Sequence, residues 1–464
     1  MMTPFTSTCL PPLDPGFISA ALWHRWFETR AHASGKAAPV TLHLCRPDGS
    51  RTRRVLTLLE DTPTNHTLNL RALERTLKFM LWQQGGNEVF IDGADSLVGE
   101  MSRMYSPDGT REFDSALMGD KIFGAPFRVS PGTPGEASAA PSHAAAIGGY
   151  TNGCRVGFDL GGSDRKCAAL IDGELVYSEE IAWNPYFQSD VSYHYQGIMD
   201  SIRRAAERLP RVDAIGGSAA GVYINNRVKI ASLFRGIPEH QFKSDVEPIF
   251  LKIAAEWGVP FEVINDGEVT ALAGSMAGNS GALLGLAMGT SEAVGYCDAE
   301  RKITNWLNEL AFAPIDYRED APEDEWSGDH GCGVQYLSQQ AVGRLLPAAG
   351  IPVEPDTPLP ERLVFVQDLM RQNDPRAERV YETIGCYLGH AAAHYASFYD
   401  LRQIMLLGRV MSGPGGDIII KQATDCLKLD FPDLAEHITF TVPDEQTRRH
   451  GQAAAAATLP FLPE

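Results

Sequence analysis

Residues 155–181 read RVGFDLGGSDRKCAALIDGELVYSEEI, and this stretch decides the fold. Apolar runs broken by turn residues predict three short strands, at 155–160, 166–172 and 174–181. The pair Asp172-Gly173 joins the last two runs, and both residues readily adopt the positive φ that a two-residue hairpin turn requires. We therefore expect an antiparallel meander.

Helices and strands alternate after this meander. We expect helices at 196–208, 245–257 and 268–277, and strands at 212–221 and 260–266. Such alternation is typical of α/β proteins. Residues 282–304 then repeat the meander, with two apolar strands joined by a glycine turn that carries a hydroxyl and a carboxylate. A repeat at domain-sized spacing predicts two similarly built lobes that enclose a cleft.

The chain has 464 residues, enough for about two to four domains. Its first part predicts a hairpin across Pro47-Asp48-Gly49, an amphipathic helix at about 69–83 and a strand near 89–91. A stretch rich in Pro, Ala and Gly follows and has the composition of a linker. The predicted domains are an N-terminal α/β extension (1–128), the linker (129–149), a first lobe (150–270, joined by a C-terminal helix at about 444–460) and a second lobe (271–443).

The charge balance excludes some classes of partner. Asp and Glu total 59 against 40 Lys and Arg, for a formal net charge of −19, which repels phosphate backbones and anionic lipids. The eight cysteines form no CxxC pair, so we expect a reducing compartment and no disulfide framework. The first thirty residues lack an uninterrupted apolar core, so we expect neither a signal peptide nor a membrane span, and a cytoplasmic protein.

The loop at 159–165, DLGGSDR, has the residue types of a phosphate-binding turn. Its two glycines allow backbone N–H groups to approach an anion closely. A strand follows the loop, whereas a helix follows in P-loop and dinucleotide-binding folds, so neither of those assignments is supported. In this interpretation Asp159 holds Mg²⁺, Ser163 donates a hydrogen bond, and Arg165 or Lys166 offsets charge. An ordinary glycine hairpin is the alternative.

The segment at 263–274, VINDGEVTALAG, predicts a strand that ends at Asn265-Asp266 and a helix that begins directly afterwards. A helix N-terminus favours the ionised carboxylate, so we expect Asp266 to be a weak base. Phosphoryl transfer tolerates a weak base, because positioning and charge stabilisation do most of the work. The alternative is that Asp266 only caps the helix.

Two further turns have compatible chemistry. Residues 288–292, MGTSE, suit the remaining phosphates through backbone N–H groups and a threonine hydroxyl. Residues 404–420, IMLLGRVMSGPGGDIII, predict an apolar strand, a turn of small residues and a helix, where a purine and its ribose can lie against backbone. A plain turn is the alternative at each position, but the order of the four segments along the chain weighs against it.

From about 153 to 460, these four segments and the closing DEQTRRHGQAAAAATLP resemble the ROK sugar kinases of the hexokinase–actin superfamily. The resemblance implies an α/β fold of two actin-like (ribonuclease H-like) lobes with a central cleft, ATP and Mg²⁺ as cofactors, and Asp266 as general base. Together with the loop chemistry it assigns the nucleotide and its Mg²⁺ to Asp159, Gly161, Gly162, Ser163, Lys166, Gly289, Thr290, Gly408, Gly415 and Gly416, with Asp159 as the Mg²⁺ contact.

The sequence departs from this family mainly where the acceptor sugar would bind. The family's EXGH segment corresponds to 309–312, where only Glu309 survives, and its CXCGXXGC zinc motif corresponds to 328–333, where only His330 and Cys332 remain as candidate ligands. A tetrahedral structural zinc site takes four ligands, so we expect no zinc there. The substrate-binding candidates are Asn265, Glu309 and His330, and the sugar stays open.

The N-terminal extension needs an interpretation of its own. ROK repressors carry a winged-helix DNA reader there, but this extension has no recognisable pair of basic helices, and the net charge opposes DNA binding. We expect an added lid or oligomerisation module. Its polar side chains suit either a substrate contact or an exposed charged loop, and the sequence leaves this open for Arg103, Tyr105, Arg111 and Asp114.

The leading hypothesis is an ATP- and Mg²⁺-dependent carbohydrate kinase that phosphorylates a hydroxyl of a sugar or polyol, acts as a homodimer and binds neither nucleic acid nor membrane. A catalytically silent sensor of sugar or nucleotide on the same two lobes is the alternative. Transfer to a carboxylate, as in acetate kinase, is a third hypothesis, but it would not need an alcohol-activating base at Asp266.

Overall fold

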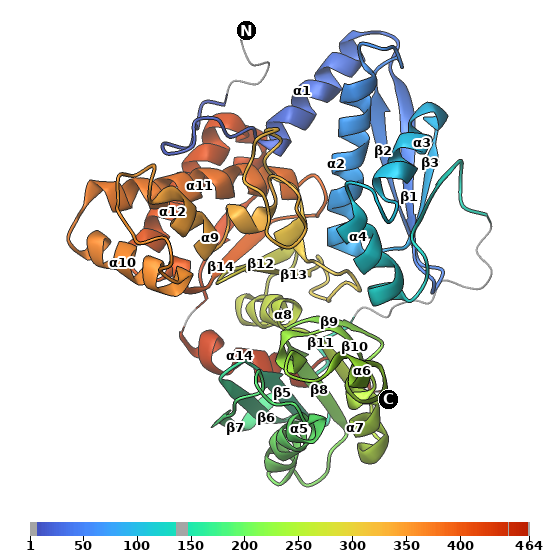
Figure 1. Cartoon of the computed structure of the whole chain (residues 1–464). Coiled ribbons are helices and arrows are strands. Elements are labelled where there is room, and N and C mark those ends of the chain that lie inside the picture. The colour runs from blue at the N-terminus through green and yellow to red at the C-terminus, as the bar shows by residue number, and fades with distance from the viewer. Residues whose placement is uncertain (1–6, 136–146, 444, 463–464) are drawn as a thin grey trace. The chain divides into compact units, whose positions relative to one another are not determined.

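The computed structural model describes residues 7–135, 147–443 and 445–462, and its chain divides into two compact units (Figure 1). Part of the predicted linker, 136–146, lies outside the described residues, and the predicted domain boundaries stay predictions. Within the described ranges, no helix is both long and apolar enough to span a membrane. Unit 1 comprises Met1–His143, Ala287–Ala293 and Trp306–Thr441, and unit 2 comprises Ala144–Leu286, Val294–Asn305 and Val442–Glu464.

Unit 2 is built on a five-stranded sheet of order β11-β8-β5-β6-β7. The predicted meander is confirmed, because β5–β6 and β6–β7 are antiparallel pairs and Asp172 and Gly173 turn with φ of 49° and 88°. Strands β8 and β11 extend the sheet in parallel with β5. The strands are β5 (Cys154–Leu160), β6 (Asp164–Ile171), β7 (Glu174–Ala182), β8 (Ala214–Ala219) and β11 (Phe261–Asn265).

Helices cover both faces of this sheet. On one face, Phe158 of β5 packs in a core with Ile198 of α5 (Val191–Ala206) and Phe250 of α7 (Ile249–Trp257). On the other face lies α14 (Glu445–Ala457), and a Cβ on Gly157 of β5 would overlap the α14 backbone. The predicted alternation of helices and strands is therefore confirmed. The helix expected from 245 begins later, because a π-helical turn occupies Phe242–Val246.

A second sheet has the order β13-β12-β14-β15, and the boundary between the units passes through β12 (Leu283–Met288) and β13 (Glu292–Cys297). These two strands, joined by a turn at Gly289, confirm the predicted repeat of the first hairpin. In unit 1, β14 (Gln403–Leu407) leads through Gly408 to α12 (Pro414–Asp430), which packs along α11 (Pro375–Tyr395). The short β15 (Thr439–Thr441) pairs in parallel with β14.

The described residues 7–131 form an α/β segment of unit 1 with a four-stranded sheet of order β2-β1-β3-β4. The hairpin predicted across Pro47-Asp48-Gly49 joins β1 to β2, and the helix and strand predicted after it are α2 and β3, so these expectations are confirmed. The elements are α1 (Ala20–Ala33), β1 (Ala38–Cys45), β2 (Arg51–Leu58), α2 (His66–Gln84), β3 (Glu88–Asp92), α3 (Asp95–Met104), α4 (Glu112–Ala116) and β4 (Arg128–Pro131).

Helix α2 is not amphipathic toward solvent as predicted, because every residue from 72 to 84 is buried. Its charged side chains are paired inside unit 1: Lys78 Nζ lies 3.0 Å from Asp114 Oδ2 and 3.0 Å from Asp329 Oδ2. Arg111 Nε pairs with Glu74 Oε1 at 2.6 Å. Buried charges are tolerated when partners compensate their lost hydration.

This burial corrects the exposed-loop interpretation for two of the polar side chains at 103–114, because Asp114 and Tyr105 are only 1% and 3% exposed. Arg103 is exposed. Arg111 is committed to Glu74 and Asp329 through ion pairs. The ion pairs of Arg111 and Lys78 with Asp329 link the extension to the rest of unit 1.

Candidate active site

The first group of predicted site residues lies where β5 ends in unit 2. Asp159 is nearly buried, and two neighbouring strands place side chains against it because of the register of the sheet. Ser218, opposite Asp159 on β8, donates a hydrogen bond from Oγ to Asp159 Oδ1 at 2.6 Å. Lys166, opposite Asp159 on β6, holds Nζ 3.9 Å from Asp159 Oδ2. Ser218 on β8 therefore orients the Asp159 carboxylate, and the Lys166 cation on β6 faces it.

The pKa of Asp159 is raised. Burial raises its pKa to about 6, the hydrogen bond from Ser218 and the charge of Lys166 act in the opposite direction, and the negative charge of Asp266 raises it further. Asp159, the predicted Mg²⁺ contact, and Asp266, the predicted general base, therefore interact electrostatically within unit 2. Pairs of carboxylates with perturbed pKa values are typical of functional sites.

The glycine turn after Asp159 is held in a defined shape. Gly161 donates its N–H to the carbonyl of Asp164 at 2.9 Å, and Trp183 Nε1 donates to the Gly161 carbonyl at 2.7 Å. Ser163 Oγ donates to Asp164 Oδ2 at 2.8 Å. The sequence left Arg165 and Lys166 as alternatives for offsetting charge at Asp159. Lys166 faces Asp159, whereas Arg165 pairs with a different carboxylate, Asp200 Oδ2, at 2.6 Å.

Asp266 is the first residue of α8 (Asp266–Gly278), directly after β11, as predicted. Asn265 caps the helix by accepting the Gly267 N–H at Oδ1 (2.7 Å), and its Nδ2 donates to the Gly221 carbonyl at 2.8 Å. Asp266 Oδ1 also accepts the Gly267 N–H at 3.0 Å. The cap therefore belongs to Asn265, and the side chain of Asp266 is not needed for that role.

The expected weak basicity of Asp266 is wrong. Burial raises the pKa of this carboxyl, and the hydrogen bonds from backbone N–H groups at the helix start only partly oppose that effect. The helix N-terminus, on which the expectation rested, favours the ionised form, whereas desolvation dominates in the folded chain. A raised pKa makes Asp266 a better proton acceptor than a solvated aspartate.

In unit 1 the second glycine turn, at 288–292, lies next to Gly408, which begins the turn after β14. Gly289 donates its N–H to the Ser291 carbonyl at 3.0 Å and accepts from the Gln339 N–H at 2.9 Å. Gly408, with φ of 91°, lies so close to the backbone of Met288 that a Cβ would overlap it. Gly408 therefore lies against the backbone of Met288, directly before the turn that contains Gly289 and Thr290.

Gly415, in the first turn of α12 directly before Gly416, borders a small cavity of about 110 Å³ in unit 1. Gly415 packs against the ring of Tyr381, where a Cβ would clash. The Tyr381 hydroxyl is buried and, among the described residues, has no hydrogen-bond partner, and burial raises its pKa, so it stays a donor. Small backbone, an aromatic ring and an unused hydroxyl suit a flat polar ring system.

The predicted acceptor-side residues Glu309 and His330 also lie in unit 1. The backbone N–H of Glu309 donates to the carbonyl of Trp82 on α2 at 2.9 Å. His330 Nδ1 lies 2.6 Å from the Ala321 carbonyl, and Cys332 nearby is buried. The N-terminal extension thus touches the segment that carries Glu309.

No model of a protein family matches the sequence, and no curated protein sequence matches it. Solved structures do match. A ROK hexokinase from Thermus thermophilus is 21% identical over 66% of this chain and 97% of its own, with a TM-score of 0.52. A ROK family transcriptional regulator, a homologue of the E. coli MLC protein, is 18% identical over 66% of this chain and 77% of its own, with a TM-score of 0.50.

The chain has the ROK fold. The resemblance drawn from the four segments is confirmed at this level, with the α/β fold of two actin-like lobes. The two neighbours are described as an enzyme and as a regulator, so the ROK fold alone does not choose between the two hypotheses.

Some residues of the site were not predicted from the sequence. Ser218 was hidden in a strand of small residues, and a hydroxyl between Gly217 and Ala219 was the only available signal. Tyr381 lies in α11, far in sequence from the glycines at 408–416, and no local sequence pattern indicates that it lines the cavity. Both become visible only through strand pairing and helix packing.

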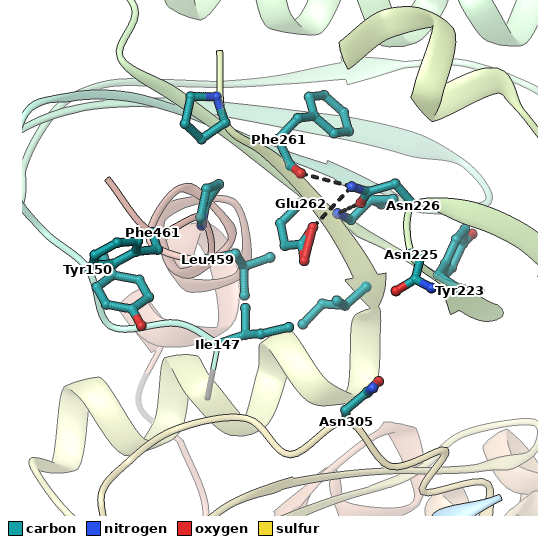
Figure 2. A pocket seen from close by; sticks show the side chains of 14 residues that line it. Ile147, Tyr150, Tyr223, Asn225, Asn226, Phe261, Glu262, Asn305, Leu459 and Phe461 are labelled. Carbon is teal, nitrogen blue, oxygen red and sulfur yellow. Dashed lines mark hydrogen bonds between the residues drawn. The ribbon is translucent and has the colours of Figure 1, made fainter. Parts of the chain in front are cut away.

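Figure 2 shows a larger pocket of about 360 Å³ in unit 2, along β11 of the ROK fold. Tyr150 and Phe461 form its aromatic wall, with ring centroids 5.4 Å apart. Glu262 accepts a hydrogen bond from Asn226 Nδ2 at Oε2 (3.0 Å), and burial raises its pKa. Neither Asp159 nor Asp266 lines this pocket, so it is separate from the predicted catalytic residues.

Proposed function

We propose that this protein transfers the γ-phosphoryl group of Mg·ATP to a hydroxyl of a sugar or sugar-like polyol, with Asp266 as the general base. The observation that carries the proposal is the pair of interacting carboxylates in unit 2: Asp266 with a raised pKa at the start of α8, and Asp159 beside a lysine and a glycine turn. A protein that only senses a ligand has no need of a general base at this position.

The residues at Asp159 fit a magnesium ion. Mg²⁺ prefers carboxylate, phosphate and water oxygens. Asp159 Oδ1 is occupied by Ser218, while Oδ2 faces Lys166 Nζ from 3.9 Å, beyond hydrogen-bond distance, and remains available. When bound with the nucleotide, Mg²⁺ neutralises part of the phosphate charge. Lys166 adds a second positive charge, which a chain of net charge −19 needs locally to hold an anion.

The remaining steps belong to the chain's own groups. Backbone N–H groups of the turns at 161–163 and 289–290 would hold phosphate oxygens, and the cavity beside Gly415 and Tyr381 would take the purine. Asp266 would orient the acceptor hydroxyl and take its proton as the new O–P bond forms and the bond to ADP breaks. Asn265, Glu309 and His330 would contact the acceptor.

The test compares Asp266→Asn with Glu262→Gln, a control carboxylate that lines the separate pocket and lies on β11, the strand that leads into Asp266. ADP release is measured with Mg·ATP across hexoses, amino sugars and inositols, and nucleotide affinity by calorimetry. We expect wild type to turn over at least one acceptor and Glu262→Gln to match it. Loss of a general base lowers turnover by about 10²–10⁴-fold, so Asp266→Asn should bind nucleotide yet turn over at this reduced rate.

Two outcomes would contradict the proposal. Turnover of Asp266→Asn close to wild type would remove the assigned base. Nucleotide binding by wild type without ADP release on any acceptor would favour the silent sensor of sugar or nucleotide. Two observations support that alternative: one structural neighbour is described as a regulator, and the sequence departs from the family around Glu309 and His330.

A further inference from the structure

A network of buried charges joins the N-terminal extension to the segment at 328–333. Asp329 in that segment is 4% exposed and forms ion pairs with three cations of the extension. Its Oδ2 lies 3.0 Å from Arg75 Nη1 and 3.0 Å from Lys78 Nζ. Its Oδ1 lies 2.8 Å from Arg111 Nη1. The extension therefore binds this segment through one buried carboxylate.

That carboxylate completes the charge balance of the extension. The three cations also form ion pairs with two carboxylates of the extension itself, Glu74 and Asp114. Asp329 supplies the third negative charge. Burial alone would raise the pKa of Asp329, but the charges of Arg75 and Lys78 lower it below its usual value. Separation of the extension from Asp329 would leave a buried charge unpaired, which is unfavourable.

The end of α2 also holds the segment that carries Glu309. The backbone N–H of Asn308 donates to the carbonyl of Gln83 at 2.9 Å. The backbone N–H of Glu309 donates to the carbonyl of Trp82 at 2.9 Å. The ring of Trp82 packs on the ring of Phe312, with centroids 4.4 Å apart. Hydrogen bonds and ring packing together fix this segment against α2.

One buried aspartate of the extension connects these two contacts. Asp114 Oδ1 accepts a hydrogen bond from Trp82 Nε1 at 2.8 Å, and Asp114 Oδ2 lies 3.0 Å from Lys78 Nζ. Lys78 in turn pairs with Asp329, and the carbonyl of Trp82 accepts the N–H of Glu309. A continuous series of polar contacts therefore runs through the extension from one segment to the other.

A fixed support fits these contacts better than a lid that opens. Opening would separate Asp329 from three cations and expose buried charges without partners. The two segments also contact each other directly, because the N–H of Gly333 donates to the carbonyl of Ala313 at 2.9 Å. The extension and both segments are therefore packed as one body within unit 1.

We propose that the N-terminal extension sets the affinity for the acceptor sugar by fixing the two segments that carry Glu309 and His330. The inference rests on the proposed function, which assigns these two residues to the acceptor. Lys78 and Trp82 are the positioning residues, and they act through Asp329 and through the backbone of Glu309. Groups that bind a ligand must be held in its geometry, so displacement of either segment weakens sugar binding.

The experiment uses the full chain with a charge-balanced double variant, Lys78→Met together with Asp329→Asn. This variant removes one positive and one negative charge, so the network keeps two cations and two carboxylates. Sugar and nucleotide affinities are measured by calorimetry, and KM and kcat by ADP release. The sugar Kd and the acceptor KM should both rise by about 10-fold or more, with nucleotide affinity unchanged.

Trp82→Phe decides the question if the double variant folds poorly. This variant keeps an aromatic ring but loses the hydrogen bond from Trp82 Nε1 to Asp114. The sugar Kd should rise in the same direction by a smaller factor, again with nucleotide affinity unchanged. An unchanged sugar Kd in both variants, wherever they fold, would contradict the proposal.

Asp430→Asn is the matched control. Asp430, at the end of α12, also ties N-terminal residues into unit 1, because it accepts hydrogen bonds from Ser7 Oγ at 2.7 Å and from the Thr8 N–H at 2.8 Å. We expect this variant to have a lower melting temperature and an unchanged sugar Kd. A rise in sugar Kd equal to that of the double variant would overturn the proposal, because general destabilisation would then explain both.

Hydrogen exchange gives a readout that needs no turnover. Backbone amides at 308–312 and 328–333 should exchange faster in the double variant than in wild type, and those of α8 should not change. Unchanged exchange at both segments would overturn the proposal. A wild type that binds a sugar without phosphorylating it would contradict the proposed function alone, because the sugar Kd would still report on positioning. A wild type that binds no sugar would overturn both.

Discussion

The two glycine hairpins, at 161–163 in unit 2 and at 289–291 in unit 1, have the same plan and different chemistry. Each joins two apolar strands, and each closes through a glycine N–H: Gly161 donates to the Asp164 carbonyl at 2.9 Å and Gly289 to the Ser291 carbonyl at 3.0 Å. A carboxylate accompanies each turn. Asp159 precedes the first turn by two residues, whereas Glu292 follows the second.

The surroundings give the two carboxylates opposite roles. Asp159 faces Lys166 and interacts with Asp266, so it keeps an oxygen for a cation. Glu292 accepts a hydrogen bond from Tyr395 at Oε1 (3.1 Å), and its Oε2 has no partner within the described ranges. Burial raises the pKa of Glu292 to about 8, so it is largely neutral at pH 7. Similar turns thus do not imply similar chemistry.

The largest expected effect is on catalytic turnover, where substitution of Asp159 and of Glu292 should give different results. Asp159→Asn should lower turnover by about 10²-fold or more, because it removes the proposed Mg²⁺ contact. Glu292→Gln should leave turnover near wild type, because the amide resembles the neutral acid already present. Steady-state kinetics on the acceptor found active measures both. Equal losses in the two variants would mean that both hairpins carry catalytic carboxylates.

The next effect is on stability against pH. The pKa of Glu292 is about 8 in the folded chain and ordinarily 4.5, so its contribution to the free energy of unfolding is complete below about pH 4.5. That contribution is lost as the pH rises toward 8, by up to about 1.4 kcal/mol per pH unit. Glu292→Gln cannot ionise and should lack this slope. Urea unfolding across the range checks it, and identical slopes would show that Glu292 is solvated.

The smallest expected effect compares the glycines. A Cβ on Gly162 would lie 2.7 Å from Tyr186 Cε2 and closer still to the hydroxyl, whereas a Cβ on Gly289 would meet only the Ser291 carbonyl at 3.4 Å. Gly162→Ala should cost about 1–3 kcal/mol of unfolding free energy through overpacking. Gly289→Ala should stay within about 0.5 kcal/mol of wild type. Chemical denaturation measures both, and a reversed order would refute the role of packing at Gly162.

Local signals in the sequence predicted much of the fold. Asp172-Gly173 turns as expected because the positive φ is a property of the two residues themselves. The register of β5 and β6 sets Lys166 opposite Asp159, whereas the sequence left Arg165 and Lys166 as alternatives. The solvent-facing side expected for α2 was wrong, because Lys78 is buried between Asp114 and Asp329, and Asp329 lies far away in sequence.

The ROK fold was predicted from the resemblance of four ordered segments to a known family, whereas hydrophobic periodicity and turn preferences, which act over a few residues, predicted individual strands and helices. The acidity of Asp266, the hydrogen bond from Ser218 to Asp159 and the meeting of Cys9 with Cys386 and Cys426 were decided only by the tertiary structure. Desolvation and side-chain pairing depend on which distant segments pack together, and the pattern along the chain does not specify that.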